Sequence, residues 1–254
     1  MRTFLLACSV PLLTGCWSVG NRHECCRTIQ LPAPDPVALA FVANGSGDFR
    51  TLSTNLGEVV EETCTPLQIE TVRWSHGFGR YITDHVDHAN HLAQGSRLAA
   101  DVTAYRRAYP GRKVYLIGHS AGCAVALAAA ERLPADSVDR IILLAPSVCV
   151  IYDLRPALRA VRCGIDVFHS DEDRVILGLG MQIVGTADRR CHEAAGQHGF
   201  MPVVTCPSDA ALNGKLRQHP WHPVVAWSGH SGGHYGSNQA GFLRAYVLPL
   251  LVAD

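Results

Sequence analysis

The stretch "KVYLIGHSAGCAVALAAAERLP", residues 113–134, contains a serine between two glycines at the junction of two predicted elements. The apolar run 113–118 is typical of a buried strand, and the alanine-rich residues 120–134 favour a helix that stops near Pro134. The junction fits the G-x-S-x-G pattern of a nucleophile elbow, a sharp turn that exposes a serine side chain. Glycine is required on both sides because a Cβ would clash in so tight a turn. The stretch therefore predicts Ser120 as a nucleophile.

The same pattern occurs a second time, in "GHSGGHYG", residues 229–236. This copy follows a predicted strand at 222–227. Its glycines at 232, 233 and 236 oppose a helix directly after the serine, because glycine is a poor helix former. Ser231 is therefore not expected to lie on an elbow.

Strand and helix patterns alternate along the rest of the chain. Continuous apolar runs predict strands that are buried on both faces, and longer patterns with one apolar face predict helices. The alternation predicts an α/β fold, a mainly parallel sheet with helices on both faces. The predicted strands are 37–43, 67–74, 113–118, 138–145, 165–170 and 222–227, and the predicted helices are 88–109, 120–134 and 237–251.

The elbow, followed by "VDRIILLAPS", resembles the α/β-hydrolase superfamily and its lipase- and esterase-like members in particular. The resemblance covers residues 37–251. It implies a serine hydrolase that cleaves small-molecule or lipid carboxylic esters through an acyl-enzyme, without a cofactor or metal. Only residues 146–164 separate the fourth and fifth predicted strands, so no large cap domain is expected there. A thioesterase, amidase or peptidase with the same catalytic residues, and an inactive hydrolase fold that only binds, remain alternatives.

The family's catalytic residues occur in the order serine, acid, histidine. The acid should follow a strand beyond the elbow, where "IDVFHSDEDRVI" begins at residue 165. Asp173 matches the family's position best, and Asp171 is the alternative. Asp166 lies inside the predicted strand.

The histidine is expected in the second glycine-rich copy. His234 is favoured over His230 because Tyr235 follows it and because it stands eight residues before Phe242, both as in the family. His230 remains the alternative.

The resemblance also implies two backbone N–H donors for the oxyanion. One belongs to Ala121, the residue after the nucleophile, and the other comes from the loop after an early strand. That loop reads "ANGSGDF", from residue 43, and assigns the second donor to Ser46. Asn44 stands where the family has histidine. An ordinary glycine-rich turn is the alternative.

Two further stretches allow more than one interpretation. Asp84, Asp87, His88 and His91 share one face if they are helical, and could bind a metal or form a solvated helix start. Phe78, within "WSHGFGR", could form a wall of the acyl pocket or lie on a surface loop.

The N-terminus has the pattern of an export signal, and "LTGC" at residues 13–16 resembles the lipobox of bacterial lipoproteins. We expect a signal peptide at 1–15, a lipid-anchored tether at 16–36 that begins at Cys16, and a catalytic domain at 37–254. Trp17 after the cysteine favours the outer membrane, by resemblance to Gram-negative sorting. A plain secretory signal is the alternative.

If the protein is exported, its cysteines are expected to form disulfides. Removing Cys8 and Cys16 from the ten leaves an even number, which in an oxidising compartment suggests disulfides without fixing their pairing.

The charge balance excludes one class of partner. Lys and Arg together number 22, as do Asp and Glu, so the chain has no basic excess for binding nucleic acid.

Overall fold

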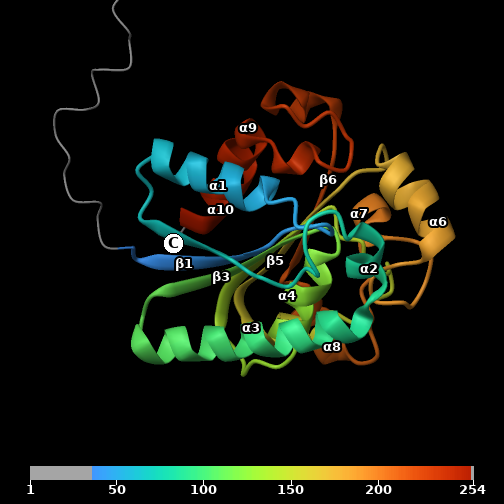
Figure 1. Cartoon of the computed structure of the whole chain (residues 1–254). Helices are drawn as coiled ribbons and strands as arrows, with labels where there is room; N and C mark the ends of the chain where they lie inside the picture. Colours follow the sequence, from blue (N-terminus) through green and yellow to red (C-terminus); the bar gives the residue numbers. More distant parts are fainter. Residues whose placement is uncertain (1–35, 253–254) are drawn as a thin grey trace, which may run out of the picture. The chain divides into compact units, whose positions relative to one another are not determined.

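Within residues 36–252, the part of the chain that the computed structural model describes, six parallel strands form one sheet (Figure 1). Their order across the sheet is β2-β1-β3-β4-β5-β6. This confirms the predicted α/β class with a parallel sheet. The predicted signal peptide and Cys16, and nearly all of the predicted tether, lie outside the described residues. No helix in the described part is long and apolar enough to cross a membrane.

The strands and helices have the following bounds. The strands are β1 (Ala38–Ala43), β2 (Leu67–Thr71), β3 (Lys113–His119), β4 (Val138–Leu144), β5 (Val161–His169) and β6 (Leu216–Pro220). The α-helices are α1 (Thr51–Glu62), α2 (Tyr81–Val86), α3 (His88–Ala108), α4 (Gly122–Ala130), α5 (Arg155–Ala160), α6 (Met181–Val184), α7 (Ala195–His198), α8 (Pro207–Asn213), α9 (Ala240–Phe242) and α10 (Leu248–Val252). Two π-helical segments, η1 (Arg174–Gly180) and η4 (Leu243–Val247), and two 3₁₀ segments, η2 (Pro223–Ser228) and η3 (Gly236–Asn238), complete the set.

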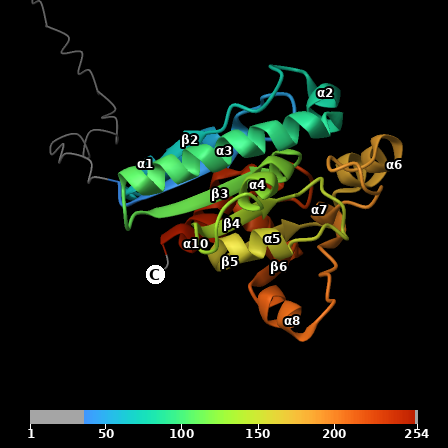
Figure 2. The ribbon, with the colours of Figure 1, turned by 90° about the horizontal axis from the view of Figure 1, so that it is seen from below.

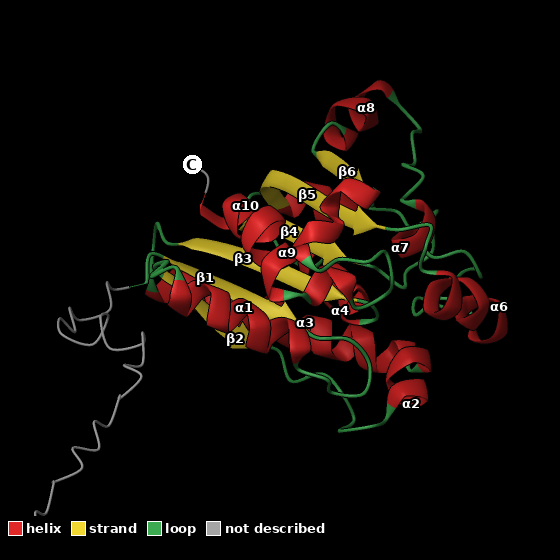
Figure 3. Cartoon of the chain, turned by 90° about the horizontal axis from the view of Figure 1, so that it is seen from above, coloured by secondary structure: helices red, strands yellow, loops and turns green. Residues whose placement is uncertain are grey.

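The sheet separates two apolar cores because side chains alternate along each strand. Leu39 and Phe41 of β1 pack with α3, α4 and α5 on one face (Figure 2). Ala40 and Val42 pack on the other face with α1 and the closing helices α9, η4 and α10 (Figure 3). Both faces are therefore covered, which explains why the central strands read as unbroken apolar runs.

The predicted strand at 222–227 is wrong. These residues form the 3₁₀ segment η2, and the sixth strand precedes them as β6, "LRQHP". β6 lies at the edge of the sheet, and its polar side chains find partners: Arg217 and His219 contact Asp166, and Gln218 bonds to the backbone of Phe200. An edge strand that satisfies polar groups in this way lacks the apolar signal used to predict the others.

Several boundaries also differ. The helix α4 ends at Ala130, four residues before the predicted end, and the predicted closing helix 237–251 begins only at Ala240 and includes the π-helical segment η4. β2 ends at Thr71, three residues before the predicted end. β5 begins at Val161, four residues before the predicted start, where the register shifts and Gly164 adopts φ +121°. This irregularity interrupts the strand pattern in the sequence. The helix α1 was not predicted.

The segment between β5 and β6 is the longest excursion from the sheet in the described part. It contains η1, α6, α7 and α8. No large cap domain is present in residues 36–252, as predicted, and the turns that cover the C-terminal edge of the sheet come from this segment and from α2 (Figure 1).

One disulfide joins this excursion to the loop after β4. It links Cys149 to Cys191, with 5.6 Å between the Cα atoms. Among the other described cysteines, Cys64, Cys163 and Cys206 are exposed and unpaired, and Cys123 is buried in α4.

Two glycines provide a test of how the fold is packed. A Cβ at Gly122 would lie 2.3 Å from the carbonyl oxygen of Ala43, so Gly122→Ala should lower the free energy of unfolding by about 2 kcal/mol or more. Gly57, inside α1, has nothing within 4 Å of the same position. Gly57→Ala should raise stability by up to about 1 kcal/mol, because alanine is the better helix former. Urea unfolding measures the free energy of unfolding of both variants. Equal changes in the two would contradict the close packing of Gly122 against β1.

Candidate active site

Ser120 lies on the turn between β3 and α4 in a strained backbone conformation. Its φ is +54°, a left-handed value that non-glycine residues rarely adopt. The turn is held by its neighbours: Ser120 N donates to the carbonyl of Leu144 on β4 at 3.0 Å, and a Cβ at Gly118 would lie 2.7 Å from the Cα of Cys123. Such strain is kept only where the surrounding packing enforces it. The geometry is that of the elbow expected from the sequence.

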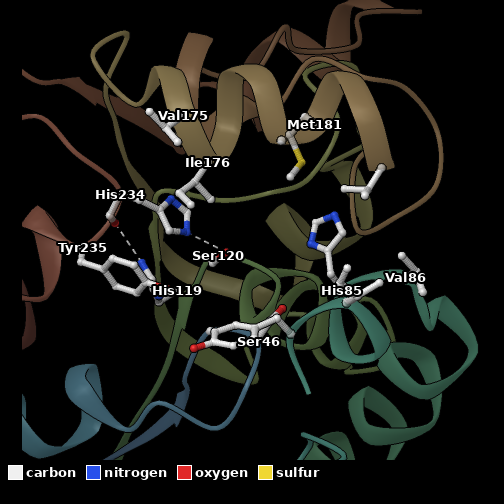
Figure 4. Close-up of a pocket in the computed structure, with 15 residues that line it drawn as sticks. Ser46, His85, Val86, His119, Ser120, Val175, Ile176, Met181, His234 and Tyr235 are labelled. Carbon is white, nitrogen blue, oxygen red and sulfur yellow. Dashed lines mark hydrogen bonds between the residues drawn. The ribbon is translucent and has the colours of Figure 1, made fainter. Parts of the chain in front are cut away.

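A chain of two hydrogen bonds links Ser120 to His234 and His234 to Asp173. His234 Nε2 lies 2.9 Å from Ser120 Oγ, and His234 Nδ1 lies 2.6 Å from Asp173 Oδ2 (Figure 4). The side chains come from three separate loops at the C-terminal edge of the sheet, and Ser120, His234 and Asp173 are 7%, 6% and 3% exposed. An ionised carboxylate only accepts, so Nδ1 carries the proton and Nε2 is free to accept from the serine hydroxyl.

Asp173 is fixed by the helix that follows it. Its Oδ1 accepts from Leu177 N at 3.3 Å, at the start of η1. The alternative, Asp171, is exposed and lines a different cavity.

Asp166 has a separate, structural partnership. Burial opposes its ionisation, but hydrogen bonds from His219, Arg217 and Arg140 outweigh this and hold the pKa of Asp166 well below its usual value.

His230 lies in the same loop as His234 but points elsewhere. Its ring packs edge-on against Phe242, and its Nδ1 accepts from Gly232 N at 3.1 Å. Burial lowers its pKa to about 4, so the ring is neutral. His230 lines a cavity that Ser120 does not reach.

His119, the residue between Gly118 and Ser120, holds the loop of His234 through a hydrogen bond to its backbone. Its Nε2 donates to the carbonyl oxygen of His234 at 3.0 Å. Burial, with a contribution from nearby His234, lowers the pKa of His119 to about 3 and keeps it neutral. No role for this residue was predicted from the sequence.

The loop that contains Ser46 lies beside the elbow, and both Ser46 and Ser120 line the same cavity. Asn44 anchors the loop to α1: its Oδ1 accepts from Ser53 N at 3.0 Å, and its Nδ2 donates to Ser53 Oγ at 2.9 Å. Within residues 36–252, no hydrogen bond engages the N–H of Ser46 or of Ala121. Both N–H groups are therefore free to donate to a ligand.

Asp84 anchors the other side of this loop. Its carboxylate is fully buried and accepts from Gly47 N at 2.7 Å, Ser75 Oγ at 2.5 Å and His76 N at 2.7 Å. Burial opposes ionisation, but the bonds from Ser75, His76 and Gly47 prevail and lower the pKa of Asp84. These bonds commit Asp84 to the loop, and the described residues form no cluster of three or more metal-ligating groups.

The cavity above Ser120 has a volume of about 260 Å³. One wall comes from α2 and the opposite wall from η1 and α6, and most of the lining is apolar (Figure 4). Besides Ser46, His119, Ser120 and His234, the lining side chains are Tyr81, Ile82, His85, Val86, Val175, Ile176, Met181, Val184 and Tyr235. Phe78 is not among them: it is 78% exposed and packs on Phe49, on the surface.

Replacing Asp84 should weaken the loop that carries Ser46. Asp84→Asn should lower the free energy of unfolding at pH 7 by about 2 kcal/mol, because charged hydrogen bonds are lost in a buried place. The folded pKa lies below the unfolded value of 3.8, so this stability is present above that value and disappears as the pH falls through the folded one. Urea unfolding at pH 7 and below pH 4 checks this, with exposed Asp101→Asn as control. If the difference in free energy of unfolding between the wild-type protein and Asp84→Asn is the same at both pH values, the predicted role of the Asp84 carboxylate is wrong.

Comparison with known proteins gives the same fold. A family model described as the alpha/beta hydrolase fold matches residues 79–161, which include the elbow. The solved structure of esterase PE8 is 17% identical, with a TM-score of 0.53, over 86% of this chain and 94% of that one. No curated protein was found to match.

Two further solved structures are similar at TM-scores below 0.5. The Pyrococcus furiosus esterase Pf2001 is 11% identical over 84% of each chain, with a TM-score of 0.47. The catalytic core of acetyl xylan esterase from Trichoderma reesei is 15% identical over 83% of this chain and 98% of that one, with a TM-score of 0.41. The sheet topology, the matched segment with its elbow and the likeness to esterase PE8 together show that this chain has the α/β-hydrolase fold.

Proposed function

We propose that this protein is a serine hydrolase that cleaves carboxylic esters through an acyl-enzyme. The observation that carries the proposal is the hydrogen-bonded chain from Ser120 through His234 to Asp173, with distances of 2.9 and 2.6 Å. A serine hydroxyl is a weak nucleophile unless an adjacent base accepts its proton. The arrangement supplies that base and a carboxylate that orients it.

The reaction follows from these contacts. Ser120 Oγ attacks the acyl carbonyl carbon while His234 Nε2 takes the hydroxyl proton. His234 then gives this proton to the leaving alcohol oxygen as the C–O bond breaks. Water then attacks the acyl carbon while His234 takes one of its protons, and the bond between the acyl carbon and Ser120 Oγ breaks. His234 returns this proton to Ser120 Oγ, which releases the acid and restores the serine hydroxyl. Asp173 keeps the proton on Nδ1 and stabilises the imidazolium in both steps.

The N–H groups of Ala121 and Ser46 stabilise the negative oxygen of each tetrahedral intermediate. Two N–H donors, held in place before the reaction, stabilise this charge without a cost of reorganisation. The bonds between Asn44 and Ser53 on α1 and from Gly47 N to Asp84 hold the Ser46 loop, and with it one donor, in place. The elbow itself holds the other.

The cavity favours an apolar acyl group. Its walls, formed by Ile82, Val86, Ile176, Met181 and Val184, suit a hydrocarbon chain. The similar protein PE8 is named an esterase, which agrees with this substrate class. The proposed chemistry needs no cofactor.

We further propose that the protein is exported and lipid-anchored at Cys16, in the outer membrane. The "LTGC" motif and the Cys149–Cys191 disulfide, a bond that persists in oxidising compartments, support export. Mass spectrometry of the mature protein tests the anchor: a mature chain that retains residues before Cys16 would disprove it.

A fluorophosphonate probe tests the proposed nucleophile. The probe should label the wild-type protein and Ser231→Ala, and should not label Ser120→Ala, because of these two serines Ser120 is the one with a hydrogen-bonded base. Hydrolysis of p-nitrophenyl esters should be lost in Ser120→Ala and retained in Ser231→Ala. An unlabelled wild-type protein would instead indicate an inactive hydrolase fold.

Two histidine variants serve as a matched control. His234→Asn should lose several orders of magnitude in kcat, whereas His230→Asn should lose far less, because the His230 ring bonds to Gly232 N in its own loop and not to Ser120. Circular dichroism of each variant shows whether it is folded. The opposite ranking would assign the base to His230.

A further inference from the structure

His85 is the one polar side chain that α2 contributes to the cavity besides the hydroxyl of Tyr81. It lies between Ile82 and Val86 on the same wall, opposite Ile176 and Met181. It is 8% exposed, so its ring is enclosed by protein and cavity. Figure 4 shows the ring directed into the space between the two walls. The reaction proposed above does not use it.

The tautomer of His85 is fixed by one hydrogen bond. Nε2 lies 2.8 Å from the carbonyl oxygen of Gly185. A carbonyl only accepts, so Nε2 carries the proton. Burial lowers the pKa of His85, so the ring is neutral near pH 7 and its Nδ1 is a bare acceptor. Within the described residues, no hydrogen bond satisfies this Nδ1.

An acceptor without a partner in an apolar cavity is costly unless a ligand or water donates to it. We infer that His85 Nδ1 accepts a hydrogen bond from a hydroxyl group of the substrate. This rests on the proposed ester hydrolysis and narrows its substrates to esters that carry such a donor. A site built around a polar group discriminates against analogues that leave the group unpaired.

The hydroxyl belongs on the acyl chain. The leaving alcohol must lie next to His234, which protonates it. In Figure 4, His85 and His234 lie on opposite sides of Ser120. The group that reaches His85 is therefore on the acyl side, and the inferred substrates are hydroxyacyl esters.

His85 could act by binding the substrate hydroxyl or only by holding the cavity wall in place, since its bond to Gly185 also connects α2 to the turn after α6. Two variants distinguish these roles. His85→Phe keeps a ring and loses both nitrogens. His85→Asn can present an acceptor oxygen near the Nδ1 position, but is too short to keep the bond to Gly185. If His85 only braces the wall, the two variants behave alike. Ile82→Ala, a change on the same wall, is the control for altered shape.

The experiment compares kcat/KM for ethyl hexanoate with that for ethyl 3-hydroxyhexanoate and ethyl 6-hydroxyhexanoate. The wild-type protein should prefer at least one hydroxylated ester by roughly threefold to tenfold, the range expected of one hydrogen bond. His85→Phe should abolish this preference, and His85→Asn should keep part of it. Ile82→Ala should change kcat/KM for all three esters by the same factor.

A binding measurement keeps this test independent of turnover. In the Ser120→Ala background, ligand-observed NMR should show the same preference, and adding His85→Phe should remove it. No preference in the wild-type protein, or one that persists in His85→Phe, would overturn the inference. The ester 2-hydroxyethyl hexanoate carries its hydroxyl on the leaving alcohol. If the protein prefers this ester over ethyl hexanoate and prefers neither hydroxyhexanoate, the acyl-side assignment is overturned. Failure of the proposed function shows itself separately, as an absence of fluorophosphonate labelling.

Discussion

The close contact between Gly122 and the carbonyl oxygens of Ala43 and Asn44 determines the arrangement of the rest of the site. A Cβ at Gly122 would lie 2.3 Å from one oxygen and 2.4 Å from the other, so only glycine allows α4 to start so near the end of β1. This contact brings the elbow and the Ser46 loop together. The two backbone donors proposed for the oxyanion come from segments 75 residues apart in sequence, and packing at one point sets their spacing.

Two buried carboxylates stabilise the loops around this point. Asp84 binds the Ser46 loop through Gly47 N, and Asp173 binds His234 and the first turn of η1. Each carboxylate accepts hydrogen bonds from donors in different segments of the chain. These bonds hold the irregular loops in one conformation. The strain at Ser120 is thus sustained by contacts from neighbouring elements. The apolar walls of the cavity then complete the site.

The strong local patterns were predictable because they depend on neighbouring residues. The elbow required a strand, two glycines and a helix within 22 residues, and α3 and β4 were predicted to within one residue at each end. Elements whose stability comes from distant partners were missed or misplaced. The polar strand β6 was not predicted, because its side chains are satisfied by Asp166 on β5 and by Phe200.

The sequence by itself determined the α/β class, the turn at Ser120 and the few candidates for the proposed acid and histidine. The preference for His234 over His230 rested on the resemblance to the family and not on geometry, because a loop with several glycines allows many directions for each side chain. Only the tertiary structure placed His234 against Ser120 and His230 against Phe242. It also turned Asp84 toward the loop of Ser46, and it placed His85 on the wall of the cavity with its Nδ1 unbonded. These outcomes depend on contacts between residues far apart in the chain, and such contacts leave no local pattern in the sequence.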